Sequence, residues 1–157
     1  MANPVVLVLN GPNLNLLGTR EPQIYGRETL SDIENRLTGH AKNRGFAIDF
    51  RQTNAEAELV DWVQASRGSA AGLIVNAGAY THTSIALLDA LRTVETPIIE
   101  VHLSNIFRRE EFRRQSYVSQ AAHGVISGFG AESYILALDA LASLLDALAP
   151  AAAGSTQ

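Results

Sequence analysis

The sequence contains no cysteine, and this absence excludes several chemistries. Without a thiol there is no disulfide, no thiolate nucleophile and no zinc or iron–sulfur site held by cysteine. Lysine is scarce as well, because Lys42 is the one lysine among 12 basic residues and the others are arginine. The formal net charge of -4 provides no basic excess for nucleic acid, so we expect no nucleic-acid partner. The preference for arginine indicates selection for its planar guanidinium rather than for charge alone.

Long hydrophobic runs are also missing from the N-terminal region. The apolar run of residues 5–9 is far shorter than the ~20 residues of a membrane-spanning helix, and residues 1–4 carry no charged n-region of a signal peptide. We therefore expect a cytoplasmic protein with no membrane partner. A chain of 157 residues with 46% hydrophobic content suits one domain, which we place at residues 1–148. Residues 149–157 are expected to form a disordered C-terminal tail.

Apolar runs and helical patterns alternate along the chain. The runs predict strands over residues 5–9, 46–51, 72–76, 97–102 and 124–127. Helical periodicity predicts helices from Thr29 to Gly45, around Leu59 to Val63, over 85–91, over about 109–114, and over 131–148. Because the strands are nearly continuously apolar, the pattern favours an α/β fold. We expect a flavodoxin-like, doubly wound five-stranded parallel sheet with helices on both faces.

Ionisable groups follow the fourth predicted strand. Glu100, His102 and Ser104 alternate, so they share one face of an extended chain. A carboxylate two residues from an imidazole can orient the ring and favour its protonated form, which makes an acid usable near neutral pH. In doubly wound folds ligands bind at the carboxyl ends of the strands, where residues 10–13, 76–79 and 102–104 are expected to meet. This pattern is typical of an active site.

The connection over residues 10–26 is long for a compact domain, and long connections often act as lids. It contains Arg20 and Tyr25. A cation about 4 Å from a tyrosine, worth ~4 kcal/mol at an effective dielectric of ~20, would favour the phenolate and so provide a base. The alternative is that Tyr25 packs on a hydrophobic edge and Arg20 is solvated. Asn13 follows Gly-Pro and has the same ambiguity, since asparagine is common in turns.

Two further segments permit a functional and a structural interpretation. Residues 76–84 are small or polar, so their backbone N–H groups could face a hydroxyl or carboxylate, but Thr83 or Ser84 could simply cap a helix with His82 exposed. Arg109 and Arg113 fall on one side of the short helix predicted there, although a solvated, salt-bridged helix is the common outcome for such a run. His40 and His123 are interpreted as surface or packing histidines.

Taken together, these segments closely resemble those of type II 3-dehydroquinate dehydratases, and the match spans nearly the whole chain in order. The segments are Gly11-Pro12-Asn13-Leu14-Asn15, Arg20-Glu21-Pro22 with Tyr25-Gly26, Asn76-Ala77-Gly78 with Thr81-His82-Thr83-Ser84, and Glu100-Val101-His102-Leu103-Ser104-Asn105 through Arg109-Glu110-Glu111-Phe112-Arg113. Each motif is weak alone, but their order on one frame makes coincidence improbable.

The resemblance implies reversible dehydration of 3-dehydroquinate to 3-dehydroshikimate through an enolate, in the shikimate pathway or in quinate catabolism, with no cofactor and no metal. It assigns Tyr25 as the base, with Arg20 and Arg109 favouring its phenolate. It implies that Asn13 helps to bind a water molecule, which in turn holds the enolate. It also assigns His102 as the acid that protonates the departing hydroxyl.

The resemblance further implies that Glu100 orients His102. For substrate binding it points to Asn76 and the backbone of Leu103 and Ser104 at the carboxylate, and to Gly78, His82 and Arg113 at ring hydroxyls. It implies that Asp89 reaches the site of a neighbouring subunit in a dodecamer built from trimers. Because arginines occupy both positions 108 and 109, either one could face the substrate, and motif spacing favours Arg109 over Arg108.

Other functions fit the sequence less well. A Schiff-base mechanism would need a lysine at a strand end, whereas Lys42 falls late in the first long helix. A flavin- or nucleotide-binding module would need a glycine-rich phosphate loop or an acidic cluster after the first strand, where this chain has Gly-Pro-Asn. In a catalytically silent scaffold, the residues needed for chemistry would have to be present but wrongly placed, because none of them is missing from the sequence.

Overall fold

The computed structural model describes residues 2–150, and its centre is a parallel β-sheet. The strands are β1 (Val5–Asn10), β2 (Ala47–Gln52), β3 (Gly72–Asn76), β4 (Ile98–His102) and β5 (Gly124–Ser127). They lie in the order β2-β1-β3-β4-β5, and every neighbouring pair is parallel. This is the flavodoxin-like order, so the predicted fold class is confirmed.

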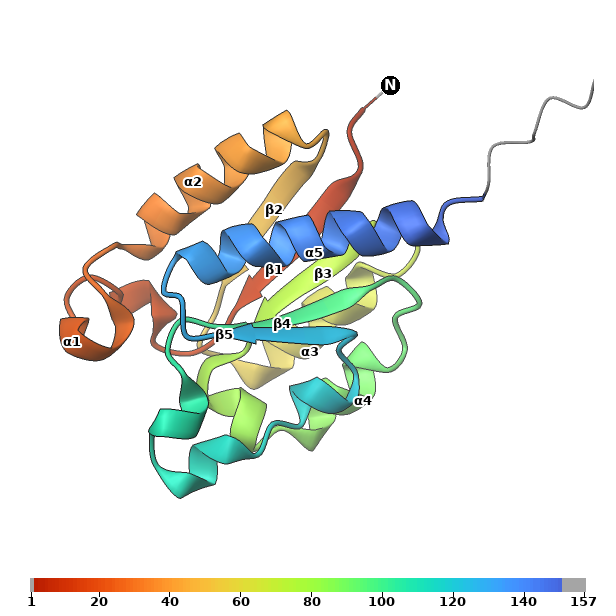
Figure 1. Ribbon diagram of the computed structural model, residues 1–157. Helices are drawn as coiled ribbons and strands as arrows, with labels where there is room; N and C mark the ends of the chain where they lie inside the picture. The colour runs from red at the N-terminus through yellow and green to blue at the C-terminus, as the bar shows by residue number, and fades with distance from the viewer. Residues whose placement is uncertain (1, 151–157) are drawn as a thin grey trace, which may run out of the picture.

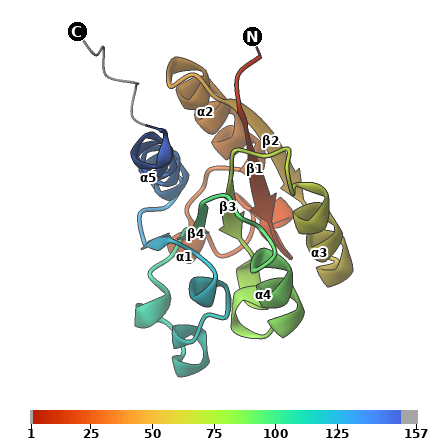
Figure 2. The same ribbon diagram turned by 90° about the vertical axis from the view of Figure 1, so that its right-hand side faces the viewer.

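Helices cover both faces of the sheet. They are α1 (Pro22–Tyr25), α2 (Leu30–Asn43), α3 (Glu56–Ala65), α4 (Ile85–Leu91) and α5 (Glu132–Leu148). Figures 1 and 2 show α2 and α5 on one face of the sheet and α3 and α4 on the other, with α1 beyond the end of the strands. Short 3-10 turns complete the connections: η1 (Leu14–Leu16), η2 (Gly78–His82), η3 (Ile106–Arg108), η4 (Glu111–Arg114) and η5 (Val118–Gln120).

The alternation of side chains along each strand separates two hydrophobic cores. Val6 and Val8 of β1 point toward α2 and α5, where they belong to one buried cluster with Leu37 and Leu138. The intervening β1 residues, such as Leu7, belong to a second cluster, which includes side chains of α3 and α4. Burial on both faces explains why β1, β3 and β4 are nearly continuously apolar.

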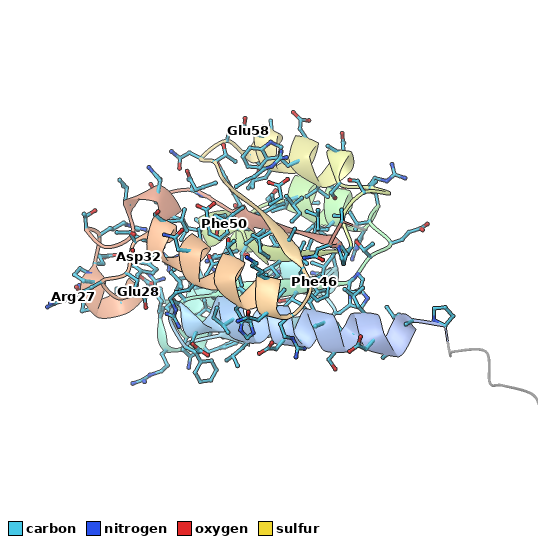
Figure 3. The ribbon with its side chains drawn as sticks, turned by 90° about the horizontal axis from the view of Figure 1, so that it is seen from above. Arg27, Glu28, Asp32, Phe46, Phe50 and Glu58 are labelled. Atoms are coloured by element: carbon cyan, nitrogen blue, oxygen red, sulfur yellow. The ribbon has the colours of Figure 1, made fainter. Side chains whose placement is uncertain are left out.

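The start of α2 follows from its sequence. The Thr29 hydroxyl accepts a hydrogen bond from the backbone N–H of Asp32 at 3.1 Å, and the Asp32 carboxylate accepts one from the Thr29 N–H at 2.9 Å. This reciprocal capping box confirms the start predicted at Thr29. Figure 3 labels Asp32 at this end of the helix, next to Arg27 and Glu28 of the preceding connection. Just after the helix, Gly45 adopts a positive φ of 83°.

One local prediction was wrong, and another lies partly outside the described residues. The predicted helix over 109–114 is instead an extended Arg109 followed by the 3-10 turn η4. The long connection over residues 10–26 contains η1 and α1. Of the expected tail over 149–157, residues 151–157 lie outside the described part of the chain.

The ends of β1 and β3 lie unusually close together. The backbone N–H of Gly11 donates to the Asn76 carbonyl at 2.8 Å, and a Cβ placed on Gly11 would overlap the carbonyl oxygen of Ala77. Glycine is therefore required for the two strand ends to approach. From here the chain leaves β1 toward α2 and leaves β3 toward α4, on opposite faces of the sheet. This divergence is the switch point at which doubly wound folds bind ligands.

Within residues 2–150, no helix combines the length and the apolar character needed to cross a bilayer.

Candidate active site

A pocket opens at the carboxyl ends of β1, β3 and β4, which include the switch point. It contains all the predicted site residues except Glu100 and Asp89. Its lining residues are Pro12, Asn13, Leu14, Arg20, Tyr25, Asn76, Gly78, Ala79, His82, His102, Leu103, Ser104, Ile106, Arg109 and Arg113. The connection after β1, the turn after β3 and the segment after β4 thus line one pocket. Figure 1 shows these three segments at the same end of the sheet.

Tyr25 lies between two guanidinium groups. The Cζ of Arg20 is 5.3 Å from the centre of the Tyr25 ring, and the Cζ of Arg109 is 5.1 Å from it. The Arg109 side chain is 14% exposed, whereas the Arg20 side chain is 40% exposed and lies 3.7 Å from Glu21. Arg109 is therefore the less screened of the two cations. Of the two sequence interpretations, the geometry favours the one that brings cations next to this phenol.

His102 is backed by a fully buried carboxylate. Its Nε2 lies 3.2 Å from the Glu100 Oε2, within range of an ion pair, although the ring N–H is not aligned for a full hydrogen bond. Ser119 Oγ donates to the same carboxylate at 2.8 Å, and Ser116 Oγ donates to its other oxygen. Burial alone raises the pKa of Glu100, but His102 and the two hydroxyls outweigh burial, so this pKa lies below its ordinary value. Glu100 is thus held as an anion behind the ring.

His82 stacks beside His102, and its surroundings favour the neutral ring. The ring centres are 6.4 Å apart with 15° between their planes. Burial lowers the pKa of His82, and nearby His102 and Arg113 add to this effect, while the Gln115 carbonyl opposes it. Nδ1 of His82 lies 2.7 Å from that carbonyl, which only accepts, so Nδ1 carries the hydrogen. Nε2 of the neutral ring is then an acceptor for a ligand hydroxyl.

Backbone groups complete the pocket. Asn13 has a positive φ of 68°, a conformation that asparagine tolerates better than most residues. Its backbone N–H donates to the Asn54 side chain at 3.0 Å, which leaves the Asn13 side chain free to line the pocket. Among the described residues, the backbone N–H groups of Leu103 and Ser104 have no backbone acceptor. These two adjacent donors suit an anionic ligand group.

The arginines after β4 divide between the pocket and the surface. Arg109 and Arg113 line the pocket, whereas Arg108 is exposed and lies outside it. Glu110 accepts a hydrogen bond from Arg113 Nε at 2.7 Å and lies 3.9 Å from Arg109 Nε. Since Arg109 is extended just after η3 and Arg113 belongs to η4, the two pocket arginines do not come from one helix face.

Asp89 is not brought into this pocket. It is exposed on α4, away from the residues that line the site. Within residues 2–150, there is also no group of three or more histidine, cysteine, aspartate or glutamate side chains arranged to hold a metal ion.

Comparison with known proteins agrees with this geometry. The family model described as "Dehydroquinase class II" matches residues 4–142. The chain belongs to this class II dehydroquinase family. It is 59% identical over 144 residues to the 3-dehydroquinate dehydratase 2 of Pseudomonas aeruginosa, covering 92% of this chain and 97% of that protein.

Solved structures of type II dehydroquinases have the same fold. The Propionibacterium acnes enzyme superposes with a TM-score of 0.87 at 43% identity, covering 90% of this chain and 98% of that one. The Butyrivibrio crossotus enzyme gives a TM-score of 0.86 at 40% identity, covering 88% of this chain and 97% of that one. The resemblance seen in the sequence motifs is therefore confirmed at the level of family and fold.

Sequence reasoning missed several residues that support this dehydroquinase site. Ser116 and Ser119 hold Glu100, the Gln115 carbonyl holds His82, and Asn54 holds the Asn13 backbone. The spacing of the two serines was the one available signal, because residues three apart lie on one side of a turn. Nothing local in the sequence marked the other two.

Proposed function

We propose that this chain catalyses the reaction for which its relatives are named, the dehydration of 3-dehydroquinate, giving 3-dehydroshikimate in the shikimate pathway. The observation that carries this proposal is one pocket that holds both a phenol between two guanidinium groups and an imidazole backed by a buried carboxylate. A base and an acid that both line the space for one small ligand are what a catalysed elimination of water requires.

Tyr25 is the base in this proposal. Its phenolate takes the proton from the carbon next to the ketone, and the electron pair moves into an enolate. The guanidinium groups of Arg20 and Arg109 lie beside the Tyr25 ring, and their positive charge would favour an anionic side chain there. Arg20 is discounted because it is well exposed, so Arg109 provides the larger share.

His102 is the acid. As an imidazolium it donates a proton to the departing hydroxyl, which leaves as water while the enolate returns its electron pair to form the conjugated enone. Glu100 keeps the ring in position from behind. The Asn13 side chain, free of other hydrogen bonds among the described residues, would help to bind a water against the enolate oxygen. Tyr25 then releases its proton to solvent and His102 takes one up, which restores both groups.

The remaining lining residues orient the substrate. The backbone N–H groups of Leu103 and Ser104, together with the Asn76 amide, form a donor cluster suited to the substrate carboxylate. Gly78, neutral His82 and Arg113 would meet the ring hydroxyls. Lys42 is exposed on α2 outside the pocket, which argues against a Schiff base, and the proposed mechanism uses no cofactor.

We also propose that the enzyme works as a dodecamer of trimers, in which Asp89 approaches a neighbouring active site. Asp89 and Ile85 lie four residues apart on one face of α4, and Ile85 is 56% exposed. An exposed isoleucine beside a carboxylate suits a covered interface. Light scattering should give the assembly mass, and Asp89→Asn should lower activity without changing that mass. A fully active Asp89→Asn variant would remove this role. The expected cytoplasmic location stays a prediction that cell fractionation can test.

The test of function is direct. Purified protein mixed with 3-dehydroquinate should produce the ultraviolet absorbance of a conjugated enone. Tyr25→Phe should abolish turnover while calorimetry still detects substrate binding, because the phenyl ring keeps the shape and loses the base. Tyr117→Phe is the matched control, since its hydroxyl has no partner among the described residues. Normal turnover by Tyr25→Phe would show that another group is the base.

A further inference from the structure

A chain of buried polar side chains runs beneath the pocket and ends at Asn76. Tyr134 of α5 is 0% exposed, and its hydroxyl lies between two asparagines. It donates to Asn10 Oδ1 at 2.6 Å and accepts from Asn76 Nδ2 at 2.9 Å. Asn10 and Asn76 are register partners at the ends of β1 and β3, so one tyrosine reaches both. This contact joins residues that are 124 positions apart in sequence.

Each link in the chain permits one direction only. The Arg51 carbonyl can only accept, and Asn10 Nδ2 donates to it at 3.0 Å, so Asn10 must present Oδ1 to Tyr134. Tyr134 must then use its single hydrogen on Asn10 and accept from its other side. Asn76 must therefore present its NH2 group to Tyr134. Its Oδ1 accordingly accepts from the Gly78 N–H at 3.3 Å.

The opposite orientation of the Asn76 amide would break two of these bonds. Its Oδ1 would face a tyrosine oxygen whose hydrogen is already used, and its NH2 would face the Gly78 N–H. Buried polar groups left without partners are costly, so the orientation observed is strongly favoured. Burial also raises the pKa of Tyr134, so its hydroxyl keeps the hydrogen on which the chain depends.

An NH2 group has two hydrogens, and Tyr134 takes only one of them. Asn76 also lines the pocket, and its Nδ2 has no second partner among the described residues. We propose that Tyr134, anchored through Asn10 to the Arg51 carbonyl, is a positioning residue that fixes the Asn76 amide as a donor toward an anionic oxygen of the ligand. This inference rests on the proposed function, because it takes the substrate carboxylate as that oxygen.

The experiment compares Tyr134→Phe with the wild type. The variant keeps the ring that packs 6.4 Å from Phe50 and removes only the hydroxyl, so the Asn76 amide is free to turn. We expect KM for 3-dehydroquinate to rise about tenfold or more, because a hydrogen bond to a charged group is lost, while kcat changes much less. A cyclohexanol analogue that bears the carboxylate should bind more weakly by a similar factor. The same analogue without the carboxylate should bind both proteins equally.

Other outcomes separate the explanations. Tyr117→Phe, the control, should leave KM unchanged. If Tyr134→Phe lowers the melting temperature but leaves KM and both analogue affinities unchanged, the hydroxyl only stabilises the fold and the inference fails. If the wild type makes no enone from 3-dehydroquinate, the proposed function itself is refuted, independently of the role of Tyr134. Should Tyr134→Phe not fold, Asn10→Ala is the alternative variant, because it removes the hydrogen-bond acceptor that fixes the Tyr134 hydroxyl. It should weaken binding of the carboxylate-bearing analogue and leave binding of the other analogue unchanged.

A neutron structure of the wild type needs neither a variant nor turnover. It should show deuterium from Tyr134 directed at Asn10 and deuterium from Asn76 directed at Tyr134. Deuterium from Tyr134 directed at Asn76 would overturn the inference, whatever the enzyme's activity.

Discussion

Replacing Ser119 by alanine would test how the buried carboxylate behind His102 is held. Ser119 Oγ donates to Glu100 Oε2 at 2.8 Å, and Glu100 is 0% exposed. A hydrogen bond to an ionised group contributes about 1.5–3 kcal/mol, and water cannot easily replace a donor at a buried oxygen. We therefore expect Ser119→Ala to lower the free energy of unfolding by about 2 kcal/mol at neutral pH. We also expect kcat to fall, because His102 loses part of the support for its position.

The sign of the pH dependence follows from the Glu100 pKa, which lies below its ordinary value of 4.5 in the folded protein. A carboxylate with a lowered folded pKa adds stability that is fully present above the unfolded pKa. That stability is lost as pH falls through the folded pKa. Ser119→Ala raises the folded pKa, so the variant has less of this stability to lose. The variant and the wild type should therefore differ less in their free energy of unfolding at acidic pH than at neutral pH. The decrease should be about 1.4 kcal/mol for each unit by which the substitution changes the folded pKa of Glu100.

Urea unfolding at neutral pH and at a series of pH values that extends well below 4.5 measures this difference. Ser69→Ala is the matched control, because the Ser69 hydroxyl donates only to neutral backbone carbonyls, at 3.2 Å and 3.4 Å. Its effect on stability should be the same at all of these pH values. If Ser119→Ala also showed an effect that did not change with pH, its hydroxyl would not be stabilising an ionised Glu100, and the reasoning would be refuted.

Two other substitutions test the site and its frame. Arg109→Ala should lower kcat by about a hundredfold, since it removes the less exposed cation beside the proposed base, and loss of one group that stabilises charge in a transition state typically has an effect of this size. Arg108→Ala, outside the pocket, should stay near wild-type activity, and equal losses would contradict the placement. Gly11→Ala should destabilise the fold by about 1–3 kcal/mol or more in thermal unfolding, because its Cβ overlaps the Ala77 carbonyl. Gly39→Ala in α2, where a Cβ meets nothing, should raise stability slightly, and a similar loss in both variants would show that no crowding occurs.

The strands were predictable because their signal is local. Runs of apolar residues between turns gave β3 and β5 with the bounds observed and the other three within one residue at each end. Burial on both faces explains this success for β1, β3 and β4, whose apolar runs are nearly unbroken, whereas the edge strands β2 and β5 are only partly buried. The start of α2 was equally local, because Thr29 and Asp32 interact directly.

The failures occurred where contacts distant in sequence decide the structure. A charged stretch at 109–114 has good helical spacing, yet Arg109 is extended, and its guanidinium lies against the Tyr25 ring. The hydroxyls on Glu100 come from residues 16 and 19 positions away, and Tyr134 reaches Asn10 across 124 positions. No periodicity within a short window can reveal such pairs.

The proposed acid and base are carried by parts of the chain of different kinds. His102 ends a central strand, whereas Tyr25 belongs to a single helical turn in the connection after β1. A change in the length of that connection would therefore shift one group and leave the other in place. Because the enolate must form before the hydroxyl can leave, such a variant would lose both the exchange of the ring hydrogen with deuterium from solvent and the loss of water. Replacing His102 would stop only the loss of water, so the two halves of the elimination are separable from the side of the acid alone.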